Sequence, residues 1–219
     1  MKKNNRYPNT SVSKALLTLL TLFILVIACS KEHTTLVTPP PPPPPPPPKD
    51  SIVMVQVSLF TSDQVPAGFA KRDNTDGIEV GVKFQTTIAG TIAGVKFYKS
   101  TLNTGTHIGQ LYTSSGTLLA SEEFKNETDS GWQTVLFVTP VPISANTTYI
   151  AAYHSSLGYY IATNWGLKTA IVNAPLTALA DSTEGRNGVY KYTNTPAVPD
   201  SGYLSNNYWV DIIANIPKP

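Results

Sequence analysis

Apolar and polar residues alternate along much of the chain after Ser51. The sequence IEVGVKFQ at residues 78–85 is the clearest case. A period of two is typical of a strand that buries one side and exposes the other. Eight further short runs predict strands, at residues 94–98, 109–113, 118–124, 133–138, 148–154, 159–163, 188–192 and 208–214.

Turn residues and prolines add detail to this pattern. Ser115-Gly116 lies between two expected strands and predicts a hairpin turn. Pro140 and Pro142 have no N–H to donate to a sheet, so we expect a strand end or a sheet edge there. Only residues 175–180 favour a helical turn. The whole pattern indicates one all-β domain over residues 51–219, an antiparallel, jelly-roll-like β-sandwich.

The first 28 residues are typical of a secretory leader. Residues 1–14 hold four basic residues and no acidic one, and residues 15–28 carry no charge and are mostly apolar. The apolar run is shorter than the ~20 residues that a membrane-spanning helix needs. We therefore interpret residues 1–28 as a signal peptide.

Cys29 follows this run in the sequence VIACS at residues 26–30, which resembles the lipobox of bacterial lipoproteins. In a lipobox the cysteine becomes the acylated N-terminus, and several acyl chains together give stable anchoring. We expect Cys29 to be lipidated and to hold the protein on a membrane. An uncleaved anchor with an incidental cysteine is the alternative. Cys29 is the single cysteine of the sequence, so the domain is expected to fold without an internal disulfide.

Residues 29–50 form a linker between the lipidation site and the domain. Ten consecutive prolines at residues 39–48 predict a polyproline II rod, at ~3.1 Å per residue about 30 Å long. We expect it to be a spacer; a ligand for proline-binding modules is the alternative. Ser30-Lys31-Glu32 partly resembles a signal for the outer face of the outer membrane. The expected location is therefore the outer membrane, with exposure at the cell surface as a hypothesis.

Removal of the leader changes the charge balance. Four of the 16 basic residues lie in the leader, which leaves 12 against 14 acidic residues and a formal charge of −2. Nothing in this balance favours a nucleic-acid partner.

Several motifs along the domain recur in the order known from a family of bacterial secreted modules. They are VGVKF at 80–84, GTIAGVKFYK at 90–99, NTGTHIGQLY at 103–112, GWQTV at 131–135, PVPI at 140–143, TTY at 147–149, NGVY at 187–190 and NNYWVD at 206–211. Residues 59–213 thereby resemble the family called domain of unknown function 4082. Tyr112 and Asn146 depart from it, since the family pattern has tryptophan and glycine there. The resemblance implies a β-sandwich, often attached to carbohydrate-related or adhesion modules, and no catalytic residue.

Aromatic residues are the first candidates for a binding site, because flat rings stack on the C–H faces of sugars. Trp165 lies in the loop-like sequence ATNWG, shortly after Tyr159 and Tyr160, and we expect the three to form a platform. Tyr112 and His107 are further ligand-binding candidates. Tryptophans can instead fill the core, which is the interpretation we favour for the two in or beside strands, Trp132 and Trp209.

Glu79 and Asp211 are candidate ligands of a structural Ca²⁺, because terminal strands of jelly-roll modules often share such an ion. The alternative is an ion pair with a lysine such as Lys83 or Lys96. A glycosidase acid and nucleophile is a third interpretation, and it requires the two carboxyls to lie close together.

No nucleophile elbow, metalloprotease motif or phosphate-binding loop is present in the sequence. We therefore expect a non-catalytic, membrane-anchored module that binds a glycan or another extracellular polymer. A structural or adhesion domain that binds protein partners is the alternative, and a small glycoside-active enzyme is a third hypothesis.

Overall fold

The computed structural model describes residues 52–67, 70–73 and 76–218. These residues form strands and no helix, which confirms the all-β class. Accordingly, no helix able to cross a membrane is found within those ranges. The predicted leader, Cys29 and the proline linker lie outside them. The strands are β1 (Met54–Val57), β2 (Ala70–Lys71), β3 (Ile78–Thr86), β4 (Gly90–Lys99), β5 (His107–Thr113), β6 (Leu118–Glu123), β7 (Gly131–Ile143), β8 (Tyr149–Ser155), β9 (Tyr160–Ile161), β10 (Ile171–Asn173), β11 (Leu176–Ala178), β12 (Val189–Tyr192), β13 (Ser201–Gly202) and β14 (Val210–Pro217).

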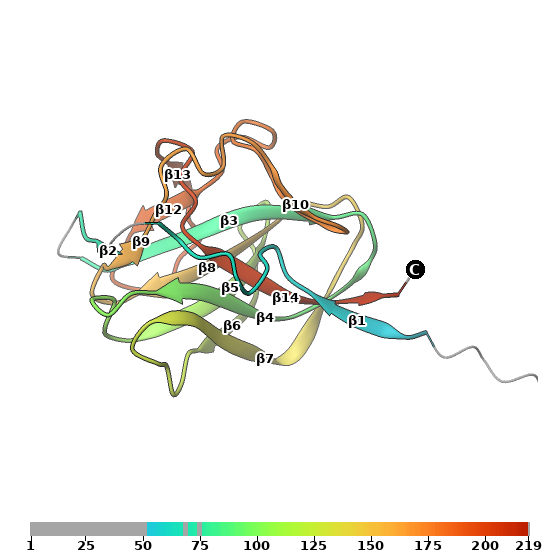
Figure 1. Cartoon of the computed structure of the whole chain (residues 1–219), viewed down its shortest axis with the longest axis horizontal. Coiled ribbons are helices and arrows are strands. Elements are labelled where there is room, and N and C mark those ends of the chain that lie inside the picture. The colour runs from blue at the N-terminus through green and yellow to red at the C-terminus, as the bar shows by residue number, and fades with distance from the viewer. Residues whose placement is uncertain (1–51, 68–69, 74–75, 219) are drawn as a thin grey trace, which may run out of the picture. The chain divides into compact units, whose positions relative to one another are not determined.

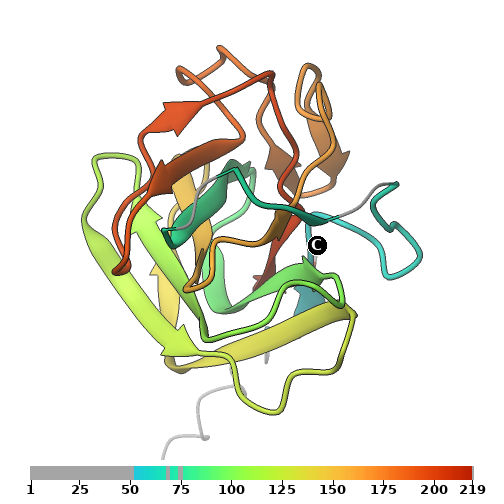
Figure 2. The same cartoon turned by 90° about the vertical axis from the view of Figure 1, so that its left-hand side faces the viewer.

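Two antiparallel sheets build the domain. One has the strand order β1-β14-β4-β7, and the other has the order β10-β11-β3-β8-β5-β6. Strand β12 also pairs with β3 and with β13, and β2 and β9 form a separate pair. Figures 1 and 2 show the two sheets stacked, with β14 and β4 against β3, β8 and β5. The β-sandwich expected from the sequence is confirmed.

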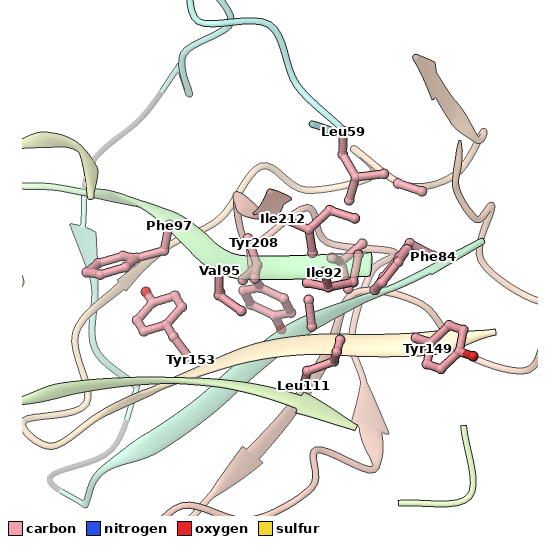
Figure 3. Close-up of a cluster of buried hydrophobic side chains, with 14 of the residues drawn as sticks. Leu59, Phe84, Ile92, Val95, Phe97, Leu111, Tyr149, Tyr153, Tyr208 and Ile212 are labelled. Atoms are coloured by element: carbon pink, nitrogen blue, oxygen red, sulfur yellow. The ribbon is translucent and has the colours of Figure 1, made fainter. Parts of the chain in front are cut away.

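Alternation along the strands sends one side of each sheet into a shared core. Phe84, Phe97, Leu111, Tyr153 and Ile212 are fully buried between the sheets (Figure 3). The rings of Phe97 and Tyr153 stack, with centroids 4.1 Å apart. Each fully buried apolar side chain of this size contributes about 1.5–3 kcal/mol, so this core is a main source of the stability of the domain.

The turn and edge predictions are confirmed. Strands β5 and β6 form a hairpin in which Gly116 has a φ of 91°, a value that favours glycine. Pro140 and Pro142 lie in β7, which is an edge strand of the four-stranded sheet. At an edge, proline removes no hydrogen bond that a neighbouring strand needs.

Residues 175–180 do not form the expected helical turn. Strand β11 lies there instead, and its residues pair with Phe84, Gln85 and Thr86 of β3. Leu176 and Ala178 are fully buried on one side of this short strand, a pattern that three residues are too few to reveal in the sequence.

A segment at residues 58–66, which we call the strap, covers the outer side of the four-stranded sheet. The Leu59 N–H donates to Asp211 Oδ1 (2.7 Å), and the Trp132 indole N–H donates to the Gln64 carbonyl oxygen (3.2 Å). The Phe60 ring lies 5.3 Å from the ring of Trp209, centroid to centroid. Trp132 and Trp209 therefore pack against the core, as the sequence indicated.

Candidate functional site

A pocket of about 280 Å³ is lined by five tyrosines and one aspartate. We call it the tyrosine pocket, and its lining residues are Asp73, Tyr160, Tyr190, Tyr192, Tyr203 and Tyr208. Asp73 follows β2, Tyr160 lies in β9, Tyr190 and Tyr192 lie in β12, and Tyr203 and Tyr208 lie in the segment before β14. These elements meet at the end of the sandwich that faces the viewer in Figure 2. Segments far apart in the sequence thus meet at one site.

The pocket has a buried floor and an exposed rim. Tyr160 and Tyr208 form the floor, each only 4% exposed, with ring centroids 5.5 Å apart. Tyr192 and Tyr203 form the rim, at 41% and 59% exposed. Tyr190 connects the rim to the floor, because its ring centroid lies 5.5 Å from that of Tyr192 and 6.4 Å from that of Tyr208. The pocket therefore offers ring faces and edges at several angles to a bound group.

The polar atoms of the pocket are mostly hydrogen-bond donors. Burial raises the pKa of Tyr160 and that of Tyr208, and the nearby Asp73 carboxylate raises both further, so these phenols stay neutral. The Tyr160 hydroxyl donates to Asp73 Oδ2. Within the described part of the chain, the hydroxyls of Tyr190, Tyr192 and Tyr203 have no hydrogen-bond partner. They are available to a ligand.

Asn187 positions β12, and with it two of the tyrosines. Strands β11 and β12 pair with different parts of the same side of β3, and Lys83 lies between these parts. The Asn187 side chain accepts from the Lys83 N–H (2.8 Å) and donates to the carbonyl oxygens of Lys83 (3.0 Å) and Leu179 (2.6 Å). The Asn187 side chain thus makes the hydrogen bonds with β3 that the backbone of a paired strand would make, at the point between β11 and β12.

Gly188 then lets β12 approach the segment before β14. Its φ is 69°, and a Cβ there would lie 1.8 Å from the Asn206 carbonyl oxygen. Only glycine fits such an approach. The close packing brings Tyr190 on β12 next to Tyr208, which explains the NGVY motif in physical terms.

Trp165 does not line the pocket, but its backbone bonds to Leu204, the residue after Tyr203 of the rim. It is 56% exposed, with a φ of 62°, and its N–H donates to the Leu204 carbonyl oxygen (2.8 Å). Leu204 and Ser205 also have positive φ, at 49° and 45°. Positive φ is unusual for large side chains, and strained backbone of this kind gathers at functional sites.

The predicted platform of Trp165, Tyr159 and Tyr160 is not formed. Tyr160, the first residue of β9, lines the pocket, whereas Tyr159, just before the strand, does not. The Arg72 guanidinium instead lies over the Tyr159 ring, 5.1 Å from its centroid. Of the three, the tyrosine pocket takes only Tyr160.

Tyr112 and His107, the further ligand-binding candidates, are both buried. Tyr112 is 4% exposed and packs with Ile150 and Val189 on the outer side of the larger sheet. His107 is fully buried, with Nδ1 2.8 Å from Glu127 Oε1 and Nε2 2.8 Å from Asn103 Oδ1. Both side chains thus make buried contacts within the domain.

Glu79 and Asp211 lie in different sheets, so they do not form the expected calcium or glycosidase pair. Asp211 accepts from the N–H groups of Leu59 and Ile212 and pairs with Lys96 Nζ (2.8 Å), which is the alternative foreseen from the sequence. Burial raises the pKa of Asp211, and Lys96 opposes that shift.

Glu79 is fully buried and has partners of its own. Its Oε2 lies 3.6 Å from His154 Nδ1 and accepts from the Ala197 N–H (3.4 Å). With its NH₂ turned toward this carboxyl, the Gln110 amide donates to Oε1 at 2.5 Å. Over the described ranges, no three histidine, cysteine, aspartate or glutamate side chains are grouped to hold a metal ion.

Five of the six pocket residues were missed by the sequence analysis. The signal was the density of tyrosine: six of the eleven tyrosines lie between residues 159 and 208. That clustering is visible in the sequence, but it does not tell which rings share a pocket.

Comparison with protein-family models gives a match. The family model described as Domain of unknown function (DUF4082) matches residues 63–210, a span that includes every residue of the tyrosine pocket. A search of curated proteins finds no match to the chain. Because the matched span is more than half of the sequence, this chain belongs to the DUF4082 family.

Proposed function

We propose that the domain is a non-catalytic binding module that holds one sugar unit of a glycan in the tyrosine pocket. The observation that carries this proposal is the pocket itself, with five rings, three unpartnered hydroxyls among the described residues and one carboxylate. Rings contact the C–H faces of a pyranose, while phenols and carboxylate bond its hydroxyls. At about 280 Å³, the pocket lies just below the ~300 Å³ at which sites for larger ligands begin. It therefore suits a single ring.

The position of the pocket supports a tethered module. The described chain begins near β1, which lies at the opposite end of the sandwich from β9 and β12 (Figure 1). A lipid on Cys29, with the proline linker as spacer, would tether the domain through the chain that precedes β1. The proposed location is the outer membrane, at the cell surface.

A second candidate is an adhesion domain that binds a protein partner along β7. Leu136 and Val138 on this edge strand are 59% and 93% exposed. An exposed apolar edge invites a further strand. Pro140 and Pro142, however, have no backbone N–H to donate to an added strand. This favours the tyrosine pocket as the main site.

The test is a glycan array with the chain from Ser30 onward, which retains every described residue. We expect at least one glycan to bind, and Tyr203→Ala to weaken binding about tenfold, since a ring contact contributes roughly 1 kcal/mol or more. Tyr203→Phe separates the ring from the hydroxyl. Leu136→Ala is the control for the β7 edge, and Trp165→Ala tests the loop beside the rim.

Two results would reject the proposal. One is an array without any bound glycan. The other is a glycan whose binding depends on Leu136 and not on Tyr203, which would favour the edge strand. A chelator is expected to leave binding unchanged, because both candidate calcium ligands already have protein partners.

A further inference from the structure

The tyrosine pocket is rich in negative potential. The faces of aromatic rings attract cations, and five rings surround the Asp73 carboxylate. No lysine, arginine or histidine lines the pocket within the ranges that the structure describes. A neutral sugar would leave this charge without a counterpart.

Among the described residues, only one of the two carboxylate oxygens of Asp73 accepts a hydrogen bond. Asp73 Oδ2 accepts from Tyr160, while Oδ1 accepts no hydrogen bond from the described residues. The buried phenol holds Asp73 at the wall of the pocket. A charged donor from a ligand can therefore reach the second oxygen.

The neighbouring basic side chains are engaged elsewhere. Lys71 Nζ donates to Asn164 Oδ1 (3.1 Å), and the Arg72 guanidinium lies over the ring of Tyr159. Lys191, on the opposite side of β12 from Tyr190, pairs with Asp200 (2.7 Å). The cation that complements the pocket has to come from the ligand.

We propose that the bound sugar carries a free amino group, so that its ammonium bonds Asp73 and lies against the tyrosine faces. This inference rests on the proposed glycan-binding function and names the ligand class of that same pocket. A polymer of hexosamine units with unacetylated amines has the required chemistry. Charge-assisted hydrogen bonds between ammonium and carboxylate are stronger than neutral ones, so the amine gives selectivity over neutral sugars.

The test compares three β-1,4-linked hexamers that differ only at carbon 2 of each unit: glucosamine, N-acetylglucosamine and glucose. Calorimetric titration of the chain from Ser30 onward at pH 6 measures each affinity. We expect the glucosamine hexamer to bind about tenfold more tightly than the other two, the range of one charged hydrogen bond. Asp73→Asn should abolish this preference.

Controls separate the charge from the fold. Asp129→Asn removes the same charge from an exposed turn before β7 and should leave the preference intact. Tyr203→Ala should weaken all three hexamers, because it removes a ring, and should leave a preference for the glucosamine hexamer, because Asp73 remains. Thermal melting of each variant confirms that it is folded.

The outcomes distinguish the two proposals. Equal or tighter binding of a neutral hexamer, or a preference that survives Asp73→Asn, overturns the amine inference and leaves glycan binding standing. No binding of any hexamer or array glycan overturns both.

Discussion

Glu79 is a buried carboxyl whose surroundings disfavour its charge. Burial raises its pKa to about 7 from an ordinary value of 4.5, and the His154 partner opposes the shift. Between these two values the unfolded chain ionises Glu79 while the folded chain keeps it protonated. The contribution of Glu79 to the free energy of unfolding is therefore highest below about pH 4.5, and it falls as the pH rises toward 7.

Glu79→Gln should remove this loss. We expect the free energy of unfolding of the wild type to fall between pH 5 and pH 8 by up to about 3 kcal/mol more than that of the variant. Urea unfolding at the two pH values measures the difference. The exposed Glu184→Gln is the control, and equal pH slopes in wild type and Glu79→Gln would contradict the prediction.

Glu127 has the opposite behaviour. Burial raises its pKa, but hydrogen bonds from His107 and Lys99 outweigh burial and leave the pKa below its usual value. Lys99 Nζ lies 2.8 Å from Oε2, and both side chains are nearly buried, at 11% and 12% exposed. This carboxylate stabilises the fold above its unfolded pKa, and the contribution is lost as the pH falls through the lowered folded value.

We predict that Glu127→Gln destabilises the domain by on the order of 3 kcal/mol at pH 7, because it leaves buried partners uncompensated. The deficit should shrink as the pH falls below 4, where the wild type also loses the charge. Glu123→Gln, which breaks the exposed pair with Lys125, should cost less than ~1 kcal/mol. A deficit that stays constant with pH would show that packing, and not charge, is responsible.

Among the strand connections, the approach to β12 is the most sensitive. Gly188→Ala should destabilise the domain by about 3 kcal/mol or more, since the new Cβ meets the Asn206 carbonyl oxygen. Gly131→Ala is a matched control, because its φ is also positive, at 98°, and nothing lies within 4 Å of its Cβ. It should cost only ~1 kcal/mol. Denaturant midpoints measure both, and similar costs at the two glycines would show that the contact with Asn206 relaxes.

The strands were predictable where alternation is long enough to be seen. In β3 the period of two extends over the whole strand, whereas β11 has only three residues and lies between β10 and β3, with which it pairs. Asn146 illustrates a finer point: it replaces the expected glycine at a φ of 54°, which asparagine tolerates.

The candidate site was less predictable, for a physical reason. Tyr159 and Tyr160 are equivalent in the sequence, and the register of β9 against β2 decides which one reaches the pocket. Asp73 and Tyr208 lie far apart in the sequence, and only the tertiary packing of the domain brings them into one pocket. The many aromatic residues indicated an aromatic binding site, but the fold determines which rings line it.

For the molecule as a whole, the tether is a prediction from the leader. Cys29→Ser should abolish incorporation of labelled palmitate and move the protein from the membrane to the soluble fraction. Protease treatment of intact cells then tests exposure, and a wild-type protein that survives intact would place the domain on the inner side. Palmitate incorporation into Cys29→Ser would contradict lipidation at this residue.

The pairing of β1 decides how the domain responds to mechanical load. Strand β1 pairs with β14 from Met54↔Pro217 to Val57↔Ala214, at the end away from the pocket (Figure 1). Antiparallel hydrogen bonds lie perpendicular to the strands, so a pull on the N-terminal side loads them together in shear, not one after another. Behind them the strap must also detach from Asp211 before the sheet opens. For the tethered binding module that we propose, tension between a bound polymer and the anchor would therefore meet the resistance of this strand pair and the strap.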